Sequence, residues 1–429
     1  MKKKKKKEKD KDKNKENKET TKDCTRDVTV KADVKPEKSP DGSEKKEKEK
    51  EEFGIEGQNM CRVFVKNYSA IGLHGLRKQF VDMKTVGPPD PRRSAFEANA
   101  DKCRYKDIPC WDRSRVILKW PEGASDFIHA NRIKHDFLNV DIICTQGPLE
   151  NTIGDFWRMV WQEKVKSILM LCQVVEQGKT KCTQYYPAEV GQEMSHFGLT
   201  ITCREIDNND KNFVVTKLHV VGPGGTEKLS VRHRNWVTWP DKDVPKSPMA
   251  PFRLLQHIRR EKHPVIIHCS AGVGRTGTLV ALELLYRSLQ NGVLPDVRSL
   301  VLELRWQRSH SVQTEDQFLY LFFSLFQLCA AKHWVPIEDI RDFCVDYDKY
   351  LELLRVHNCK NLPMELTENL RNVTLGALTP PASAPSANKA EPSPNQNEPS
   401  GTPAARIKEV RSEMYPVDQT ATANPTKPT

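Results

Sequence analysis

The stretch at residues 264–277, PVIIHCSAGVGRTG, constrains the fold more than any other part of the chain. Its apolar run at 265–267 is long enough for a buried strand and follows Pro264. Residues 278–286 then carry apolar side chains at a helical period. The loop between them therefore joins a buried strand to the first turn of a helix, which indicates an α/β protein.

A loop of this kind is predicted to bind an anion. The first N–H groups of a helix have no intrahelical partner and lie at the positive end of the helix dipole. Gly272 and Gly274 allow the backbone to curl, so that several N–H groups converge on one point. We expect five residues to surround the anion, namely Ser270, Ala271, Gly272, Val273 and Gly274.

Cys269 and Arg275 make this predicted anion site reactive. The positive field of the loop favours the thiolate over the thiol of Cys269. The guanidinium of Arg275 can donate two hydrogen bonds to a bound phosphate. The pattern predicts in-line attack of sulfur on phosphorus and a phosphocysteine product. Because Arg275 and the loop amides neutralise the phosphate, we expect no metal and no other cofactor.

The sequence HCSAGVGRTG at 268–277 resembles the protein tyrosine phosphatases, whose signature reads HCSxGxGR[ST]G. It matches at every specified position, including His268 before the nucleophile. The resemblance implies a cysteine-based, phosphotyrosine-specific enzyme, and we expect the non-receptor type. It also implies that the Thr276 hydroxyl stabilises the departing thiolate.

The stretch KCRYKDI at 102–108 resembles the family's phosphotyrosine-recognition loop, KNRYxDI. The resemblance implies that Tyr105 stacks on the phenol ring of the substrate and that Asp107 accepts hydrogen bonds from its backbone. A ring wall would fix the depth of the cleft, so that only a long aromatic phosphoester reaches the thiolate. Cys103 stands where the family usually has Asn.

The stretch EQGKTKCTQYYP at 176–187 resembles the family loop ExGxxKCxxYWP, with Tyr186 in place of Trp. The resemblance implies that Glu176 pairs with Arg275 and holds the guanidinium in its plane. It places Lys181 near the rim of the site.

The stretch WPDKDVP at 239–245 resembles the family's mobile WPDxGVP loop. A tyrosine alkoxide leaves poorly unless it is protonated, so the chemistry needs a movable acid. The resemblance assigns this role to Asp241, with Trp239 as the hinge anchor and Pro240 as the stiffener. Asp243 replaces the usual Gly, and we expect slower closure or a shifted closing equilibrium.

The stretch RWQRSHSVQTEDQF resembles the family segment QRxxxVQTxxQY. The resemblance implies that Gln313 orients the water that hydrolyses the phosphocysteine and that Gln317 assists. Thr314 and Gln317 also form a capping-box pattern before an apolar helix that runs to about Ala331. Both roles of Gln317 stay open.

The remaining patterns predict a twisted mixed β-sheet flanked by helices, with the reactive loop at the carboxyl end of a strand. Expected helices cover residues 63–83, as one or two helices, and residues 152–161, 296–307 and 336–356. Expected strands include 126–133, 140–148 and 167–172, followed by an antiparallel group at 200–203, 213–216, 218–221 and 231–238.

Composition divides the chain into four predicted segments. Residues 1–52 contain 20 Lys and Arg against 15 Asp and Glu and almost no large apolar side chain, which predicts a disordered tail over 1–53. The phosphatase-like domain is expected at 54–331 and a helical extension at 332–374. Residues 375–429, rich in Pro, Ser, Ala and Asn, are predicted to be disordered.

The charge pattern and the cysteine content indicate which partners and which cellular compartment suit the chain. The lysine run at residues 2–7 is suited to an acidic or anionic partner such as nucleic acid, anionic lipid or a nuclear import receptor. Nowhere do 18 apolar residues follow one another, so we expect no transmembrane segment. The 12 cysteines are scattered without zinc-ligand spacing, which favours reduced thiols in a cytosolic or nuclear protein.

The sequence therefore predicts a phosphatase that acts on phosphotyrosine in proteins. Two alternatives stay open. A phosphatase of broader specificity would use basic loop residues for lipid phosphates, or a shallower site without the Tyr105 wall. A non-catalytic phosphotyrosine-binding module would be expected to lack Cys269, Asp241 or Arg275, and all three are present.

Overall fold

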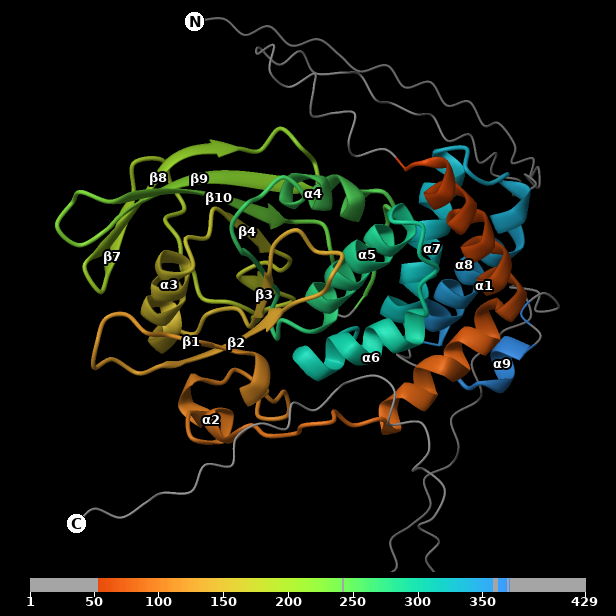
Figure 1. Ribbon diagram of the computed structural model, residues 1–429, viewed down its shortest axis with the longest axis horizontal. Coiled ribbons are helices and arrows are strands. Elements are labelled where there is room, and N and C mark those ends of the chain that lie inside the picture. Colours follow the sequence, from red (N-terminus) through yellow and green to blue (C-terminus); the bar gives the residue numbers. More distant parts are fainter. Residues whose placement is uncertain (1–52, 241–242, 358–361, 369, 371–429) are drawn as a thin grey trace, which may run out of the picture. The chain divides into compact units, whose positions relative to one another are not determined.

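The computed structural model describes residues 53–240, 243–357, 362–368 and 370, and the largest sheet among them has nine strands (Figure 1). The strands lie in the order β1 (Arg115–Ile117), β2 (Phe127–Ile133), β3 (Ile142–Thr145), β11 (Val265–His268), β4 (Ser167–Met170), β10 (Lys228–Trp236), β9 (Phe213–Val221), β8 (Leu199–Asp207) and β7 (Glu193–His196). Both parallel and antiparallel neighbours occur, so the predicted mixed sheet is confirmed.

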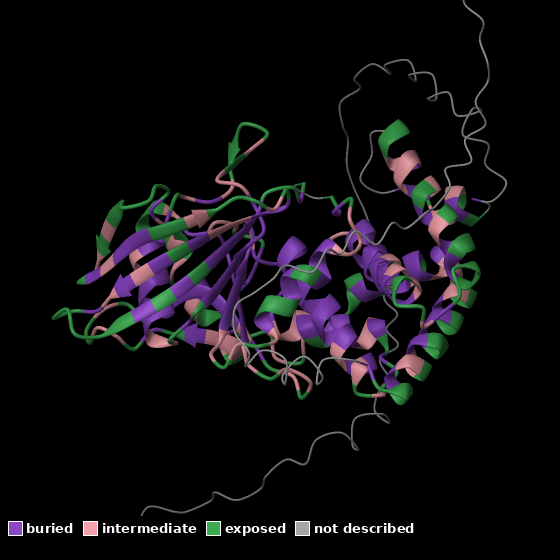
Figure 2. Cartoon of the chain, turned by 90° about the horizontal axis from the view of Figure 1, so that it is seen from above, coloured by how far each residue is buried: buried purple, intermediate pink, exposed green. Residues whose placement is uncertain are grey.

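The centre of this sheet is parallel. Strand β11 lies between β3 and β4, and β10 continues the parallel group beyond β4. Every residue of β3, β4 and β11 is buried, as expected for strands covered on both faces. Figure 2 shows these inner strands in purple, with exposed residues more frequent toward the outer strands. The site loop follows β11 at the carboxyl ends of this parallel group.

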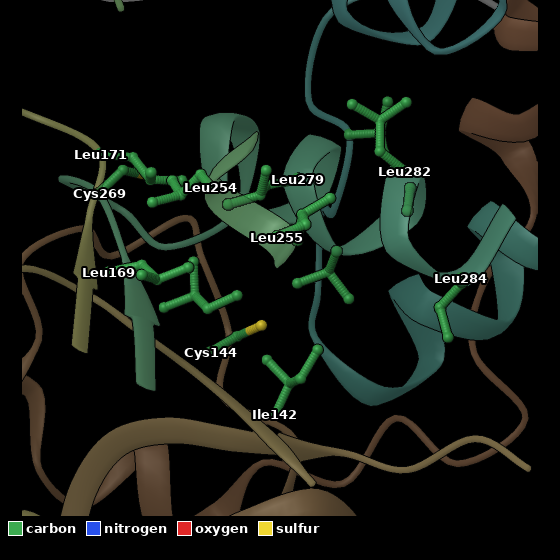
Figure 3. Packing of buried hydrophobic residues seen from close by; sticks show 14 of the residues in the cluster. Ile142, Cys144, Leu169, Leu171, Leu254, Leu255, Cys269, Leu279, Leu282 and Leu284 are labelled. Atoms are coloured by element: carbon green, nitrogen blue, oxygen red, sulfur yellow. The ribbon is translucent and has the colours of Figure 1, made fainter. Parts of the chain in front are cut away.

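Helices cover the sheet and build a second layer beside it (Figure 1). Those described are α1 (Ile55–Asp82), α2 (Ser94–Glu97), α3 (Ile153–Gln162), α4 (Ala250–Ile258), α5 (Gly274–Gln290), α6 (Val297–Gln307), α7 (Glu315–Ala331), α8 (Glu338–Val356) and α9 (Glu365–Glu368). In Figure 3, Leu254 and Leu255 of α4 and Leu279 of α5 lie together with Leu169 of β4 in one buried cluster. Strands β5 (Val175–Glu176) and β6 (Lys179–Thr180) form a separate, small antiparallel hairpin.

Two helix starts follow the sequence signals. The Asp296 carboxylate accepts the backbone N–H of Arg298 at 3.0 Å and caps α6. Thr314 and Gln317 form the predicted capping box at the start of α7. These short-range hydrogen bonds satisfy N–H groups that the helix leaves unpaired, which is why a local pattern predicts them.

Some boundaries differ from the sequence-based expectations. Helix α1 begins at Ile55 rather than near Val63, and it kinks at Gly72, whose φ is 69°. The kink fits the expectation of one or two helices in this region. The strands expected at 213–216 and 218–221 form one strand, β9, because the exposed Lys217 between them still pairs in the ladder. Strand β7 was not predicted from the sequence, since it is short and only partly buried.

Both predicted tails lie outside the described residues, apart from Phe53. Phe53 is buried and stacks on Trp334, with 4.2 Å between ring centroids. Packed structure therefore reaches at least one residue into the segment expected as tail. Within the described part of the chain, none of the helices has both the length and the apolar character needed to cross a membrane.

The segment expected as a helical extension packs on the domain through a buried charge network. Arg77 of α1 donates from Nε to Glu315 of α7 at 2.6 Å, and Tyr350 of α8 donates to the same carboxylate at 2.9 Å. Arg77 also donates to the carbonyl of Leu362 and to the hydroxyl of Thr367. One buried cation thus connects α1, α7, α8 and α9.

Replacing Arg77 by methionine is expected to lower the free energy of unfolding by about 3–5 kcal/mol, because Glu315 would remain buried without its partner. Urea denaturation followed by circular dichroism measures this loss. Arg62→Met is the matched control, since Arg62 is exposed and, in the part of the chain that the structure describes, bonds only to the side chain of Asn59. Equal stability of the two variants would contradict the assigned role.

Candidate active site

The loop after β11 surrounds the Cys269 thiol. Cys269 is 4% exposed, and the backbone N–H of Gly272 donates to its Sγ at 3.2 Å. Gly272 has a φ of 70°, and a Cβ there would lie 2.0 Å from the Thr145 carbonyl oxygen of neighbouring β3. Glycine is therefore required at this position for both conformation and space. The predicted strand–loop–helix unit is present, with α5 beginning at Gly274.

Arg308 holds the outside of this loop. Its Nε donates to the carbonyl of Gly272 at 3.1 Å and its Nη2 to the carbonyl of Ala271 at 2.8 Å. Its Nη1 donates to Asn131 at 2.8 Å and to Nδ1 of His129 at 3.1 Å. Burial and the adjacent guanidinium lower the pKa of His129 to about 3, so the ring is neutral and able to accept this bond. Arg308 therefore fixes the positions of two carbonyl groups of the site loop.

The sequence reasoning assigned no role to Arg308, although it lies within the QRxxxVQT resemblance. The sequence offered one signal for such a role, because Arg308 is a charged residue between two segments with helical apolar spacing. Its partners in β2 and the site loop lie 36 residues or more away along the chain.

Replacing Arg308 by lysine is expected to lower kcat on the order of 10²-fold. A lysine ammonium cannot bond to both loop carbonyls and to Asn131 at the same time. The loop N–H groups would then no longer be held in the orientation that binds the anion. Steady-state kinetics on a phosphotyrosine peptide measure the change. Arg305→Lys is the comparison variant, since Arg305 bonds to backbone carbonyls outside the site loop. A similar loss in both variants would contradict a specific effect of Arg308.

Glu176 fixes the Arg275 guanidinium by a two-pronged ion pair. Nη1 and Nη2 of Arg275 lie 2.7 and 2.9 Å from the two carboxylate oxygens of Glu176. Burial is the largest influence and lowers the pKa of Arg275, but the bonds to Glu176 together with the nearby Cys269 and Cys172 outweigh it and raise the pKa above the ordinary value. The backbone N–H of Gln173 donates to the same carboxylate at 2.9 Å. The pairing implied by the family resemblance is thus present, which holds a permanent cation at the start of α5.

Arg275 also contacts the start of the segment expected as the acid loop. Its Nη1 donates to the carbonyl of Trp239 at 3.1 Å. The indole of Trp239 is buried, lies 4.7 Å from the Trp236 ring, and donates to the carbonyl of Asp243 at 3.0 Å. The Asp243 carboxylate in turn accepts the N–H of Val244 at 2.7 Å. These bonds fasten both ends of the segment.

The expected acid itself, Asp241, lies outside the described residues, as does Lys242. Pro240, the expected stiffener, is described and exposed. The role of Asp241 therefore stays a prediction from the sequence, and the structure positions only its neighbours.

Tyr105 closes one side of the site. Ser270 donates from its hydroxyl to the carbonyl of Lys181 at 2.8 Å, so its oxygen accepts the Tyr105 hydroxyl at 2.9 Å. The recognition loop, the reactive loop and the Lys181 segment therefore meet at Ser270. Asp107 is exposed two residues beyond Tyr105, where a peptide could reach it.

Gln146 braces the recognition loop, another residue that the sequence reasoning missed. Its side chain accepts the N–H of Arg104 at 2.9 Å and donates to the carbonyl of Lys102 at 2.8 Å. Arg104 donates from Nε to the carbonyl of Gly147 at 3.1 Å. Cys103, in place of the family's Asn, contributes a thiol contact to the carbonyl of Asn99 at 3.2 Å. The loop is thus held on both sides of Tyr105 despite the substitution.

The two glutamines lie beside the start of α5. A Cβ built on Gly274 would stand 3.2 Å from the side-chain oxygen of Gln313 and 3.1 Å from the amide nitrogen of Gln317. Gln317 also accepts the backbone N–H of Gln313 at 3.1 Å as part of its capping role. Thr276 is buried, and its hydroxyl oxygen has no hydrogen-bond partner among the described residues. The two glutamines therefore lie close in space to the first turn of α5, which carries Arg275 and Thr276.

His268 connects the loop to two further side chains. A carbonyl only accepts hydrogen bonds, so His268 donates from Nδ1 to the Cys269 carbonyl at 3.1 Å. The hydroxyl of Tyr185 lies 2.7 Å from Nε2 of His268 and 2.8 Å from Nε2 of His233. Burial lowers the pKa of His233 to about 3 and raises the pKa of Tyr185. The sequence reasoning named neither Tyr185 nor His233, because they lie on separate segments.

A comparison with known families agrees with this geometry. The family model described as protein-tyrosine phosphatase matches residues 99–327, which include every site residue discussed above. The chain belongs to the protein-tyrosine phosphatase family. Among the described residues, no cluster of three or more His, Cys, Asp or Glu side chains is arranged to hold a metal ion.

Similar members of the protein-tyrosine phosphatase family include human receptor-type tyrosine-protein phosphatase eta, at 35% identity over 268 residues, which is 60% of this chain and 20% of that protein. Human receptor-type tyrosine-protein phosphatase H is 36% identical over 284 residues, 62% of this chain and 25% of that protein. The chain thus spans about a quarter or less of these relatives' length. A solved structure concerning the PTPN18 fingerprint on distinct HER2 tyrosine phosphorylation sites superposes with a TM-score of 0.56 at 31% identity, covering 63% of this chain and 99% of that one.

Proposed function

We propose that this chain hydrolyses phosphotyrosine in proteins through a phosphocysteine intermediate. The observation that carries the proposal is the Cys269 thiol inside a loop whose Gly272 N–H donates to sulfur, with Arg275 fixed nearby by Glu176. A nucleophile, amide donors and an oriented cation are the groups that phosphoryl transfer to sulfur requires.

In the first step, Sγ of Cys269 attacks phosphorus in line and the bond from phosphorus to the tyrosine oxygen breaks. The loop amides and Arg275 stabilise charge on the three non-bridging oxygens. Because Glu176 binds Arg275 through both terminal nitrogens, the guanidinium plane is set before substrate binds, which lowers the ordering cost at the transition state. Asp241 donates its proton to the departing phenolate oxygen.

In the second step, water attacks the phosphocysteine, and the bond between sulfur and phosphorus breaks. Gln313 orients this water, and Asp241, now ionised, accepts its proton. The buried Thr276 hydroxyl donates a hydrogen bond to the departing thiolate. The products are inorganic phosphate and the regenerated enzyme.

The depth of the proposed active-site cleft supports selectivity for phosphotyrosine over shorter phosphoesters. The Tyr105 ring is anchored to Ser270 at the mouth of the loop, so it can flank a substrate phenol while the phosphate reaches Cys269. Asp107 is available to accept hydrogen bonds from the substrate backbone. The loop side chains Ser270, Ala271 and Val273 supply no extra positive charge for the additional phosphates of a lipid headgroup.

The direct test is turnover by the purified full-length chain. We expect release of inorganic phosphate from a phosphotyrosine peptide and little from the matched phosphoserine peptide or from phosphoinositide headgroups. Tight binding of the phosphotyrosine peptide without phosphate release would instead support a non-catalytic binding module. Comparable turnover of all three substrates would support a phosphatase of broader specificity.

A further inference from the structure

Arg234 of β10 is a buried cation with few partners. It is 6% exposed, and its Nη1 donates to the hydroxyl of Ser167 at 3.0 Å. Its Nε and Nη2 have no protein acceptor in the part of the chain that the structure describes. Neither nitrogen is fully shielded from solvent, so both remain able to bind a ligand.

The other buried arginines among the described residues are compensated. Three of them pair with a carboxylate, and the fourth bonds to Asn131, His129 and two backbone carbonyls; the four are Arg77, Arg158, Arg275 and Arg308. A buried charge without a counter-ion costs stability, because desolvation is not repaid. Arg234 is therefore the exception that an external anion would compensate.

Further cations surround Arg234. Arg232 is exposed on the same face of β10 and makes no ion pair within the described ranges. Burial first, and then the charge of Arg232, lower the pKa of Arg234 to about 10, and the opposing attraction of Glu261 is smaller. The pKa of His257 on α4 is also lowered, by partial burial and by four arginines, Arg234, Arg232, Arg260 and Arg253. Arg253 pairs with Asp210, whereas neither Arg232 nor Arg234 has an ion pair within the described ranges, so the charges of these two are available to an anion.

Arg232 lies at the other end of the strands from Cys269, and the side chain of Arg234 extends to that end, since its backbone pairs with Leu169 but its Nη1 bonds to Ser167. Arg232 pairs with Ser167, the first residue of β4, whereas His268 pairs with Met170, the last residue of that strand. Three residues of strand separate the two levels by about 10 Å. The cluster is therefore a separate location, and the inference does not depend on the proposed phosphatase activity.

We propose that Arg234, Arg232 and the end of α4 form a second anion site, which binds a compact phosphate-bearing group. A guanidinium presents paired N–H donors that match two phosphate oxygens, and Arg234 has Nε and Nη2 available for this geometry. Arg232 adds long-range attraction. The shared chemistry is a phosphate group, carried either by a soluble anion or by a lipid headgroup.

Nuclear magnetic resonance of the His257 ring during titration with pyrophosphate tests the site without interference from the catalytic loop. We expect saturable shifts and a higher pKa of His257, because the anion offsets the nearby arginines. Arg234→Gln should weaken the apparent affinity by about tenfold or more, as expected for lost charged hydrogen bonds. Arg232→Gln, at an exposed position, tests the site even if the first variant folds poorly. Lys164→Gln is the control, since Lys164 is exposed and pairs with Glu227.

Sedimentation with phosphatidylcholine vesicles, with and without phosphatidylinositol bisphosphate, separates the two sources. Arg234-dependent binding to the phosphorylated vesicles supports a lipid headgroup, and saturable pyrophosphate binding without vesicle binding supports a soluble anion. The proposal is overturned if His257 does not respond, if its response is linear as for an adventitious ion only, or if both arginine variants respond like the unaltered protein and the Lys164 control.

Discussion

Cys269→Ser is expected to abolish hydrolysis of a phosphotyrosine peptide while leaving its binding measurable. A serine hydroxyl is not ionised at neutral pH and cannot replace the thiolate as nucleophile. In the proposed site the loop amides and Arg275 hold the phosphate, and the ion pair of Arg275 with Glu176 does not involve the thiol. Phosphate release in single-turnover experiments and calorimetric binding of the same peptide measure the two parts separately.

Cys344→Ser is the matched control for this substitution. Cys344 lies on α8, is partly exposed, and accepts a hydrogen bond from Gln327 at 3.3 Å that a serine oxygen can also accept. Turnover should stay near that of the unaltered protein. If Cys269→Ser retained comparable turnover, Cys269 could not be the nucleophile and the phosphocysteine mechanism would fail.

Asp241→Ala is expected to slow phosphotyrosine peptides on the order of 10²–10⁴-fold, the range for a lost general acid. An aryl phosphate with an acidic leaving group should be slowed much less, because that group departs without a proton. The variant should also lose the basic limb of its pH–rate profile, which requires the protonated acid, and keep the acidic limb. Kinetics on both substrates from pH 4 to pH 8 would measure these effects.

Asp243 provides the control for the acid. Its carboxylate accepts the N–H of Val244, and Asp243→Asn keeps that acceptor while removing the titratable group. We expect this variant to retain the basic limb and most of its activity. If Asp241→Ala slowed both substrates equally and Asp243→Asn lost the basic limb, the general acid would be Asp243.

Local patterns in the sequence were sufficient to predict the reactive loop. A strand, a glycine-containing turn and a helix start are short-range features, and Cys269 and Arg275 lie within seven residues of one another. The helix start at Asp296 and the capping box at Thr314 were predicted for the same reason, since each involves residues two or three positions apart. The ion pair of Glu176 with Arg275 was reached only by family resemblance, because 99 residues separate the partners.

The sequence by itself determined the chemistry of the loop and the mixed α/β architecture, because both depend on residue type and on short periods along the chain. The tertiary structure decided which buried charges are compensated. Arg308 meets the loop carbonyls, and Arg77 meets Glu315, only after distant segments pack together. Arg234 lies in an equally regular strand pattern, yet among the described residues packing gives it one hydrogen-bond partner, the Ser167 hydroxyl. Compensation of a buried charge depends on three-dimensional neighbours, and no local pattern encodes them.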